Sequence, residues 1–320
     1  MFGYLGIRVG LKRSMIWGVA LSAAATTLFG IAPGTVLIFV APLLQGASAA
    51  ATWTAGLSLV AQRHIERRVE AMGYVLIGST AGTLLAAVLG GLLYQIGGYA
   101  LPFLVVGLLV AIDAGLRVLV LPPDQNTRQA FPKLITLLLD GSVLISGAGV
   151  GLAAIGWSIV DPLLPAQLSR TGVEPPVIGL IFIISTIVYG LSAPVVEWVS
   201  KRIPIKRIVA GGTVAMGIAL PLLGIVHGSI AIVLVLCIVC ICYAFMLDPT
   251  SAELANAADR QGTTCYTVVY AVYNVAYSVG MLASNAATAA AVSRLSYSHI
   301  LLSVSAVLFL AAPFLWLKEP

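Results

Sequence analysis

Charge is scarce in this chain. Asp, Glu, Lys and Arg make up only 9% of its 320 residues, whereas roughly a quarter of the residues in soluble domains are charged. Hydrophobic residues make up 60%, and the mean hydropathy is +1.04. A soluble core has no need for this much apolar sequence. The composition therefore excludes an ordinary soluble domain and predicts a protein embedded in a lipid bilayer.

Metal-binding and catalytic motifs are also missing. The three histidines lie in or near loops, and the CxxC formed by Cys237 and Cys240 falls inside an apolar run with no second pair beside it. Zinc sites and redox centres need more ligands than this. The sequence contains neither a Ser-His-Asp arrangement nor a GxxxxGK[ST] phosphate loop. We expect no cofactor, no metal and no enzyme activity.

Long apolar runs fill most of the sequence. About twenty apolar residues span a bilayer, and the weak alternation typical of a β-barrel is absent. The sequence therefore predicts an all-α polytopic membrane protein with ten spans. The runs lie near 14–33, 36–61, 71–96, 99–121, 136–168, 176–199, 207–226, 229–248, 264–292 and 298–317.

The basic residues alternate with these runs. Arg170 and Arg294 fall in gaps that otherwise lack Lys and Arg, and the other fifteen of the seventeen basic residues fall in every second gap. The positive-inside rule then places both termini in the cytoplasm, in a protein that we expect in the cell membrane. Loops facing anionic lipid account for the net charge of +5, so we predict no nucleic-acid partner. The fifteen are Arg8, Lys12, Arg13, Arg63, Arg67, Arg68, Arg117, Arg128, Lys133, Lys201, Arg202, Lys206, Arg207, Arg260 and Lys318.

The first residues carry a recognisable pattern. Residues 3–13, GYLGIRVGLKR, resemble the cytoplasmic loop signature that follows the second helix in the major facilitator superfamily. The resemblance implies the two-bundle fold of that family with about ten of its usual twelve helices. It divides the chain into a truncated N-terminal bundle of four spans (1–121), a cytoplasmic linker (122–132) and a C-terminal bundle of six spans (133–320).

Four further stretches resemble the drug/proton antiporter branch of this family, which includes the vesicular monoamine transporters. Residues 44–46 and 52–56 are similar to its fourth helix, Gly82 with residues 90–91 to its fifth, residues 161–165 to its seventh, and residues 270–280 to its eleventh. The resemblance implies a secondary transporter for small amphipathic or cationic organic molecules. It also implies a proton as the coupling ion.

Several positions depart from the family pattern. Ile7 replaces an Asp, Pro42 an Arg, and residues 86–87 and 284–285 each replace a Gly-Pro pair. In the second copy of the loop signature, residues 194–207, the usual Gly, Asp and Gly are Glu197, Lys201 and Pro204. These departures leave two alternatives open, an incomplete or degenerate protein that does not transport and an uptake carrier for a neutral solute.

Asp161 is the first candidate for substrate binding. An ionised carboxylate at mid-membrane costs about 2.5 to 3.5 kcal/mol, so each intramembrane acid needs a reason. Asp161 precedes Pro162, where a kink frees backbone groups, and Trp157 lies one turn earlier on the same helix face. A carboxylate beside an aromatic ring suits an organic cation. Alternatively, Asp161 lies near the membrane surface and caps the kink.

Other candidates come from the tenth and eleventh predicted helices. Asp248 lies near the place of a carboxylate in the family's tenth helix. At 100° per residue, Tyr270 and Asn274 share one face of the eleventh helix with Tyr266, Tyr273 and Tyr277, and such polar faces normally turn toward the bundle interior. Asn274 stands where monoamine carriers have a carboxylate. The alternative for this face is helix packing through tyrosine hydroxyls.

Two isolated aromatic residues, Trp53 and Tyr189, lie deep enough in their spans to line the same cavity or else to fill packing gaps. Two other acids read as structural. Asp113 lies four residues before Arg117 and can pair with it along a helix, and Asp140 precedes Gly141 and Ser142 at a predicted helix start. The glycines at 147, 149 and 151 predict close contacts between helices.

Overall fold

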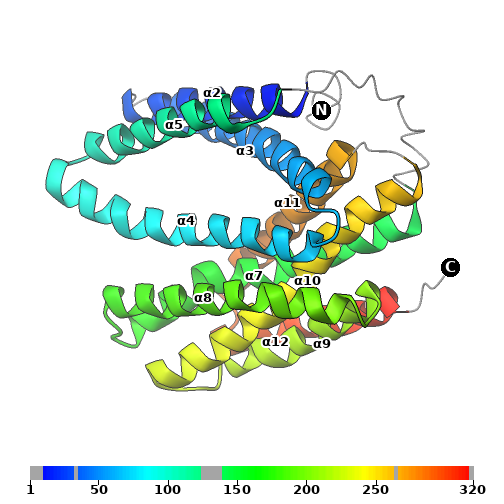
Figure 1. The fold of residues 1–320 in the computed structure, drawn as a ribbon. Coiled ribbons are helices and arrows are strands. Elements are labelled where there is room, and N and C mark those ends of the chain that lie inside the picture. Colours follow the sequence, from blue (N-terminus) through cyan, green and yellow to red (C-terminus); the bar gives the residue numbers. More distant parts are fainter. Residues whose placement is uncertain (1–9, 32–34, 124–138, 263–265, 317–320) are drawn as a thin grey trace.

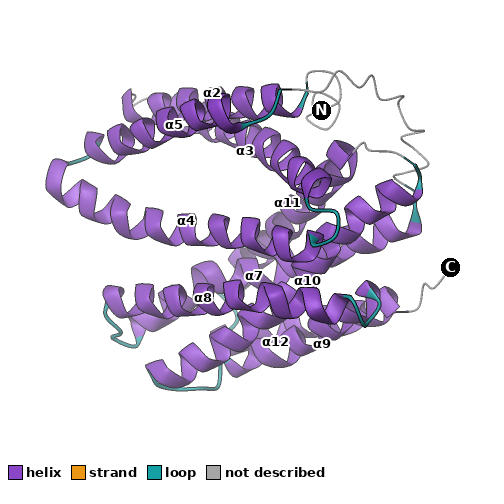
Figure 2. Ribbon diagram, in the orientation of Figure 1, coloured by secondary structure: helices purple, strands orange, loops and turns teal. Residues whose placement is uncertain are grey.

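The computed structural model describes residues 10–31, 35–123, 139–262 and 266–316. Within these residues the chain forms ten α-helices and no strand (Figure 1 and Figure 2). Seven of the ten are long and apolar enough to cross a membrane when only the described residues are counted. These seven are α5 and α7 to α12.

The helices fall close to the predicted spans. In the first half they are α2 (Leu11–Ile31), α3 (Thr35–Arg63), α4 (Arg68–Gly97) and α5 (Ala100–Val120). In the second half they are α7 (Gly141–Arg170), α8 (Pro175–Ser200), α9 (Ile205–Leu222), α10 (Ser229–Arg260), α11 (Tyr266–Ala291) and α12 (Tyr297–Trp316).

One predicted boundary is wrong. The run ending at residue 248 continues as α10 to Arg260 and passes through Pro249. Hydropathy falls after 248 because this last part carries Glu253, Asn256 and Asp259. These side chains are paired with arginines, Glu253 with Arg260 and the other two with Arg68, so the polar turns of the helix are satisfied.

Two sets of helices lie one above the other in Figure 1, α2 to α5 and α7 to α12. In the first set α2 packs against both α3 and α5, and in the second α10 packs against α7, α8 and α9. The sets meet where α4 contacts α8 and α3 contacts α11. The predicted linker lies outside the described residues from 124 onward, so the division into two bundles at 122–132 stays a prediction.

Local chemistry explains several helix ends. The Asp140 carboxylate accepts hydrogen bonds from the backbone N–H groups of Ser142 (2.8 Å) and Val143 (3.3 Å), so it is the N-cap of α7 as expected. Asp113 pairs with Arg117 at 2.9 Å, one turn later on α5, which confirms the structural role predicted for that acid. Lys12 donates to the Val118 and Leu121 carbonyls at the end of α5, where the helix dipole favours a cation.

Small residues bring α7 close to its neighbours, as predicted. A Cβ added at Gly149 would lie 2.8 Å from Thr250 Cγ2 and 3.0 Å from Val209 Cγ1, while one at Gly151 would lie 3.5 Å from the Ala276 carbonyl oxygen. A Cβ at Gly280 of α11 would overlap the carbonyl oxygen of Gly151. Membrane helices associate through such contacts because lipid offers no hydrophobic driving force between them.

Candidate functional site

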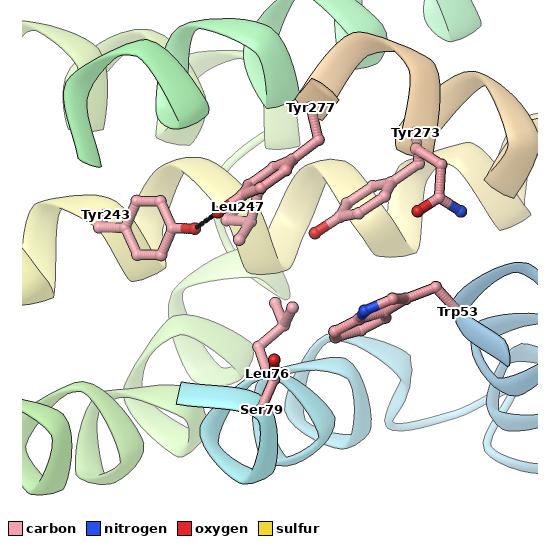
Figure 3. A pocket seen from close by; sticks show the side chains of 8 residues that line it. Trp53, Leu76, Ser79, Tyr243, Leu247, Tyr273 and Tyr277 are labelled. Atoms are coloured by element: carbon pink, nitrogen blue, oxygen red, sulfur yellow. Dashed lines mark hydrogen bonds between the residues drawn. The ribbon is translucent and has the colours of Figure 1, made fainter. Parts of the chain in front are cut away.

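A cavity of about 140 Å³ lies where the two sets of helices meet. Side chains from α3 and α4 form one wall and side chains from α10 and α11 form the other (Figure 3). The first wall holds Trp53, Leu76 and Ser79, and the second holds Tyr243, Leu247, Tyr273, Asn274 and Tyr277. Any change in how the two sets approach each other therefore changes the cavity.

Aromatic rings dominate the second wall. The hydroxyl oxygens of Tyr243 and Tyr277 lie 3.1 Å apart and share a hydrogen bond, and the ring of Tyr277 stacks on that of Tyr273 at 6.2 Å. Figure 3 shows the indole of Trp53 across the cavity from these tyrosines. Three tyrosines facing a tryptophan offer π-surfaces and hydroxyl groups to one small ligand.

Asn274 connects the two walls. Its side-chain amide donates to the hydroxyl of Thr54 on α3 (2.9 Å) and to the backbone carbonyl of Tyr270 (3.0 Å). Thr54 is buried, so the amide finds its partner inside the protein, as an amide in a lipid-facing helix could not. The polar face of α11 therefore turns toward α3 and the cavity.

Asp161 approaches the aromatic wall through Trp157. The Asp161 side chain is exposed, and Trp157 interacts with its carboxylate. The indole of Trp157 stacks on the ring of Tyr243 with centroids 5.2 Å apart. An exposed acid on α7 thus reaches the cavity wall through two aromatic rings.

Asp248 lies on the other flank of Tyr243. The Tyr189 hydroxyl donates to Asp248 Oδ1 at 2.9 Å, and the ring of Tyr189 lies 5.7 Å from that of Tyr243. Asp248 is fully buried, and its Oδ2 atom has no hydrogen-bond partner. That oxygen points at the backbone of α4, where a Cβ added to Gly73 would lie 2.9 Å from it.

A buried arginine joins the two sets of helices at one end of the molecule. Arg68, at the start of α4, is 4% exposed and bridges to the second set of helices. Its guanidinium donates to Asn256 Oδ1 (2.8 Å), Asp259 Oδ2 (2.5 Å) and the Tyr266 hydroxyl (3.0 Å). We call this the basic end, because Arg63, Arg67, Arg68, Lys201, Arg202 and Arg260 lie in the helix ends and loops gathered there.

The sequence model of the Major Facilitator Superfamily matches residues 1–147 and 146–320. The chain belongs to the major facilitator superfamily. The all-α polytopic fold and the family resemblance that were predicted from sequence are thereby confirmed.

Relatives of the chain within the superfamily are transporters and not enzymes. The chromaffin granule amine transporter of Rattus norvegicus is 25% identical over 97% of the chain and 61% of its own length. The synaptic vesicular amine transporter of Bos taurus is 26% identical over 99% and 63%. The vesicular acetylcholine transporter of Drosophila melanogaster is 23% identical over 85% and 50%. The chain therefore spans between half and two thirds of the length of these relatives.

The predicted site residues of this major facilitator protein occupy different places. Trp53 and Asn274 line the cavity, while Trp157 and Tyr189 lie behind Tyr243 and each connect it to one acid. Asp161 and Asp248 are the two acids and do not line the cavity themselves. Tyr270 is fully buried and donates to the Ser251 carbonyl at 3.0 Å, one turn away from the cavity toward the basic end.

Six lining residues were not predicted from the sequence to line the cavity: Leu76, Ser79, Tyr243, Leu247, Tyr273 and Tyr277. Tyr273 and Tyr277 were placed on the polar face of α11, but nothing in the sequence distinguished them from Tyr270. Tyr243 and Leu247 lie four residues apart on α10, which puts them on one face, but the surrounding run is apolar all round. Leu76 of α4 is an ordinary apolar residue in its helix. Their role depends on which helices meet.

Proposed function

We propose that this protein is a secondary active transporter that carries small organic cations in exchange for protons. The observation that carries the proposal is the aromatic cavity between the two sets of helices, with an acid on either flank of Tyr243. Major facilitator proteins place their sites at such an interface, where rocking of the two halves gives alternating access.

The cavity chemistry suits an amine. Aromatic faces attract a cation by about 0.5 to 2 kcal/mol each, most strongly where water is excluded. Asp161 adds a negative charge within reach of Trp157. A volume of about 140 Å³ is close to that of an apolar cavity that holds one benzene ring. The amine and acetylcholine transporters among the relatives support a cationic substrate.

Asp248 is the group that we assign to the proton. A buried carboxylate with one oxygen unsatisfied is costly when ionised, and a bound proton removes that cost. The carboxylate is covered by α4 and held by Tyr189 of α8, so separation of these helices would expose it. Protonation of Asp248 and closure of the basic end are then linked.

We propose transport out of the cytoplasm, and the placement of the basic end supports this direction. The positive-inside rule puts this end in the cytoplasm, in a cell membrane or in that of a vesicle. We take the Arg68 bridge to close this end, so that the structure would represent a state without access from the cytoplasm. Protons entering through the opposite end would drive the cation out of the cytoplasm, which is efflux or vesicular loading.

The test is transport in proteoliposomes with an acidic interior. Phenethylamine is a one-ring amine, and phenethyl alcohol is its neutral counterpart. We expect the amine to accumulate beyond the passive level of protein-free liposomes only with the pH gradient, and Asp161→Asn to lower accumulation to that passive level. Asp113→Asn, which removes an acid paired with Arg117 on α5, is the control that should transport normally. Unchanged accumulation in Asp161→Asn would remove that acid from the mechanism.

Uptake of a neutral solute is the second candidate, and Asn274 favours it. This residue brings an uncharged amide to the cavity wall. Movement of phenethyl alcohol without a pH gradient, at a rate above that of protein-free liposomes, would support this candidate over antiport. If neither compound moves, the non-transporting alternative takes precedence.

A further inference from the structure

Helix α4 starts without a cap of its own. Its N-cap residue is Arg67, whose side chain makes no capping hydrogen bond. Glu70, the acid in the first turn, pairs with Arg67 at 2.6 Å and accepts from the Tyr74 hydroxyl at 3.0 Å. Backbone N–H groups in the first turn of a helix need an acceptor from elsewhere.

That acceptor comes from the other set of helices. Glu197, near the end of α8, accepts a hydrogen bond from the backbone N–H of Glu70 at 3.0 Å through Oε2. Its other oxygen pairs with Lys201 at 3.1 Å, one turn later on α8. The Glu197 side chain is buried although it carries a charge. The Glu70 N–H group and the Lys201 ammonium group therefore both offset the cost of burying that charge.

We propose that Glu197 is a positioning residue that caps α4 across the interface and holds the basic end closed. A carboxylate at a helix N-terminus is stabilised by both the free N–H groups and the helix dipole. When the two sets of helices separate at this end, α4 loses its cap and Glu197 loses its donor. The contact therefore stabilises only the closed state.

This role gives a physical reading to a departure from the family signature. The pattern has Gly where this chain has Glu197 and Asp where it has Lys201, so the acid stands one helical turn earlier than in the signature. Of the two substituted residues, Glu197 contacts α4 and Lys201 pairs with Glu197. The inference rests on the proposed alternating access, but its test requires no transport.

The test measures how often the basic end is open. Spin labels on cysteines introduced at Ile65 and Ile203 report the separation of the two sets, because these residues are exposed in loops at the basic end on opposite sides of the interface. Native cysteines are replaced by serine. We expect Glu197→Ala to lower the closed-to-open ratio about fivefold, the equivalent of losing one N-cap. Glu197→Gln, which keeps an acceptor oxygen, should lower it less.

Two further variants separate positioning from simple stabilisation. Glu66→Gln removes an exposed acid in the loop before α4 and should leave the ratio unchanged. Arg67→Ser adds a local cap to α4 in the Glu197→Ala background. We expect it to restore thermal stability but not the closed-to-open ratio, whereas a merely structural Glu197 predicts that both recover.

An unchanged distance distribution in Glu197→Ala and Glu197→Gln would overturn the proposal, as would an equal shift in Glu66→Gln. If Glu197→Ala does not fold, the proposal is tested by Glu197→Gln, whose closed-to-open ratio should be lower than that of Glu66→Gln. A shifted ratio in a protein that moves no substrate would support the Glu197 contact and count against the transport proposal alone.

Discussion

Tyr243 is the residue on which the cavity depends most. It stacks on Trp157, approaches Tyr189 and shares a hydrogen bond with Tyr277. Two acids that lie on different helices, Asp161 and Asp248, are each one aromatic neighbour away from it. A ligand in contact with Tyr243 would therefore lie near both carboxylates and interact with them electrostatically without contacting either.

Trp53 should discriminate cations from neutral ligands. Trp53→Leu keeps an apolar side chain but removes the π-face, so we expect phenethylamine to bind about five- to thirtyfold more weakly, the equivalent of about 1 to 2 kcal/mol. Binding of phenethyl alcohol should fall less. Equilibrium binding of both compounds to purified protein checks this. Trp198→Leu is the matched control, since Trp198 is exposed at the basic end. If both compounds lost affinity equally, Trp53 would contribute only to the shape of the cavity and not to a cation–π interaction.

Asp248 should couple proton movement to transport. Asp248→Asn keeps an oxygen that accepts from Tyr189 but carries no titrating proton, so phenethylamine binding should persist with little pH dependence. Substrate-driven proton flux should disappear. Flux is measured with a pH-sensitive dye inside proteoliposomes, with Asp113→Asn as the reference variant. Normal proton flux in Asp248→Asn would mean that another group carries the coupled proton.

At the scale of elements, α7 and α11 form the closest pair in the second set. Besides the approach of Gly280 to Gly151, Ser284 on α11 donates to the Ile155 carbonyl on α7 at 3.0 Å. Ser284 stands where the family has a Gly-Pro pair, so this departure also makes a specific contact. Two departures, at 197 and 284, thus have structural roles.

Gly280→Ala should loosen this pair. The new methyl group would overlap a backbone oxygen, and backbone cannot move aside as a flexible side chain can, so we expect a loss of about 1 to 3 kcal/mol in stability. Gly211→Ala on α9 is the control. A Cβ there meets open space, and alanine favours a helix, so its melting temperature should stay or rise. Thermal unfolding in detergent compares the two. Equal melting temperatures would mean that the helices tolerate a wider separation.

For the whole molecule, the basic end carries two contacts across one interface. Arg68 joins α4 to α10 and α11, and Glu197 joins α8 to α4. Because both contacts involve the first turn of α4, this turn joins the two sets at the basic end. Opening the end requires both to break.

Arg68→Gln should open the basic end. Removing a buried arginine leaves Asp259 without its cation and Tyr266 without a donor, at a cost of about 3 kcal/mol to the closed state. An introduced cysteine at Ala255, which is fully buried in the closed structure, should then react faster with a membrane-impermeant thiol reagent. Arg67→Gln is the control because Arg67 is exposed and forms its ion pair with Glu70 of the same helix. Unchanged labelling in Arg68→Gln would show that Arg68 does not close this end.

The sequence by itself determined the ten helices, the membrane environment and the family. Hydropathy and loop charge are local properties, so each run reports its own span. Local spacing was also enough to predict the ion pair of Asp113 with Arg117 and the helix cap formed by Asp140. It failed at α10 beyond residue 248, because two of the polar side chains there, Asn256 and Asp259, are satisfied by Arg68, about 190 residues away.

Only the tertiary structure decided which polar and aromatic side chains meet. The eleventh helix presents several tyrosines on one face, and α3 and α10 determine that Tyr273 and Tyr277 line the cavity while Tyr270 packs against Ser251. Tyr243 gave no signal in an apolar run. In the sequence Glu197 is only a departure from the loop signature, and its contact with the uncapped start of α4 exists only in the folded protein. Contacts between distant helices depend on packing, which periodicity along one helix does not encode.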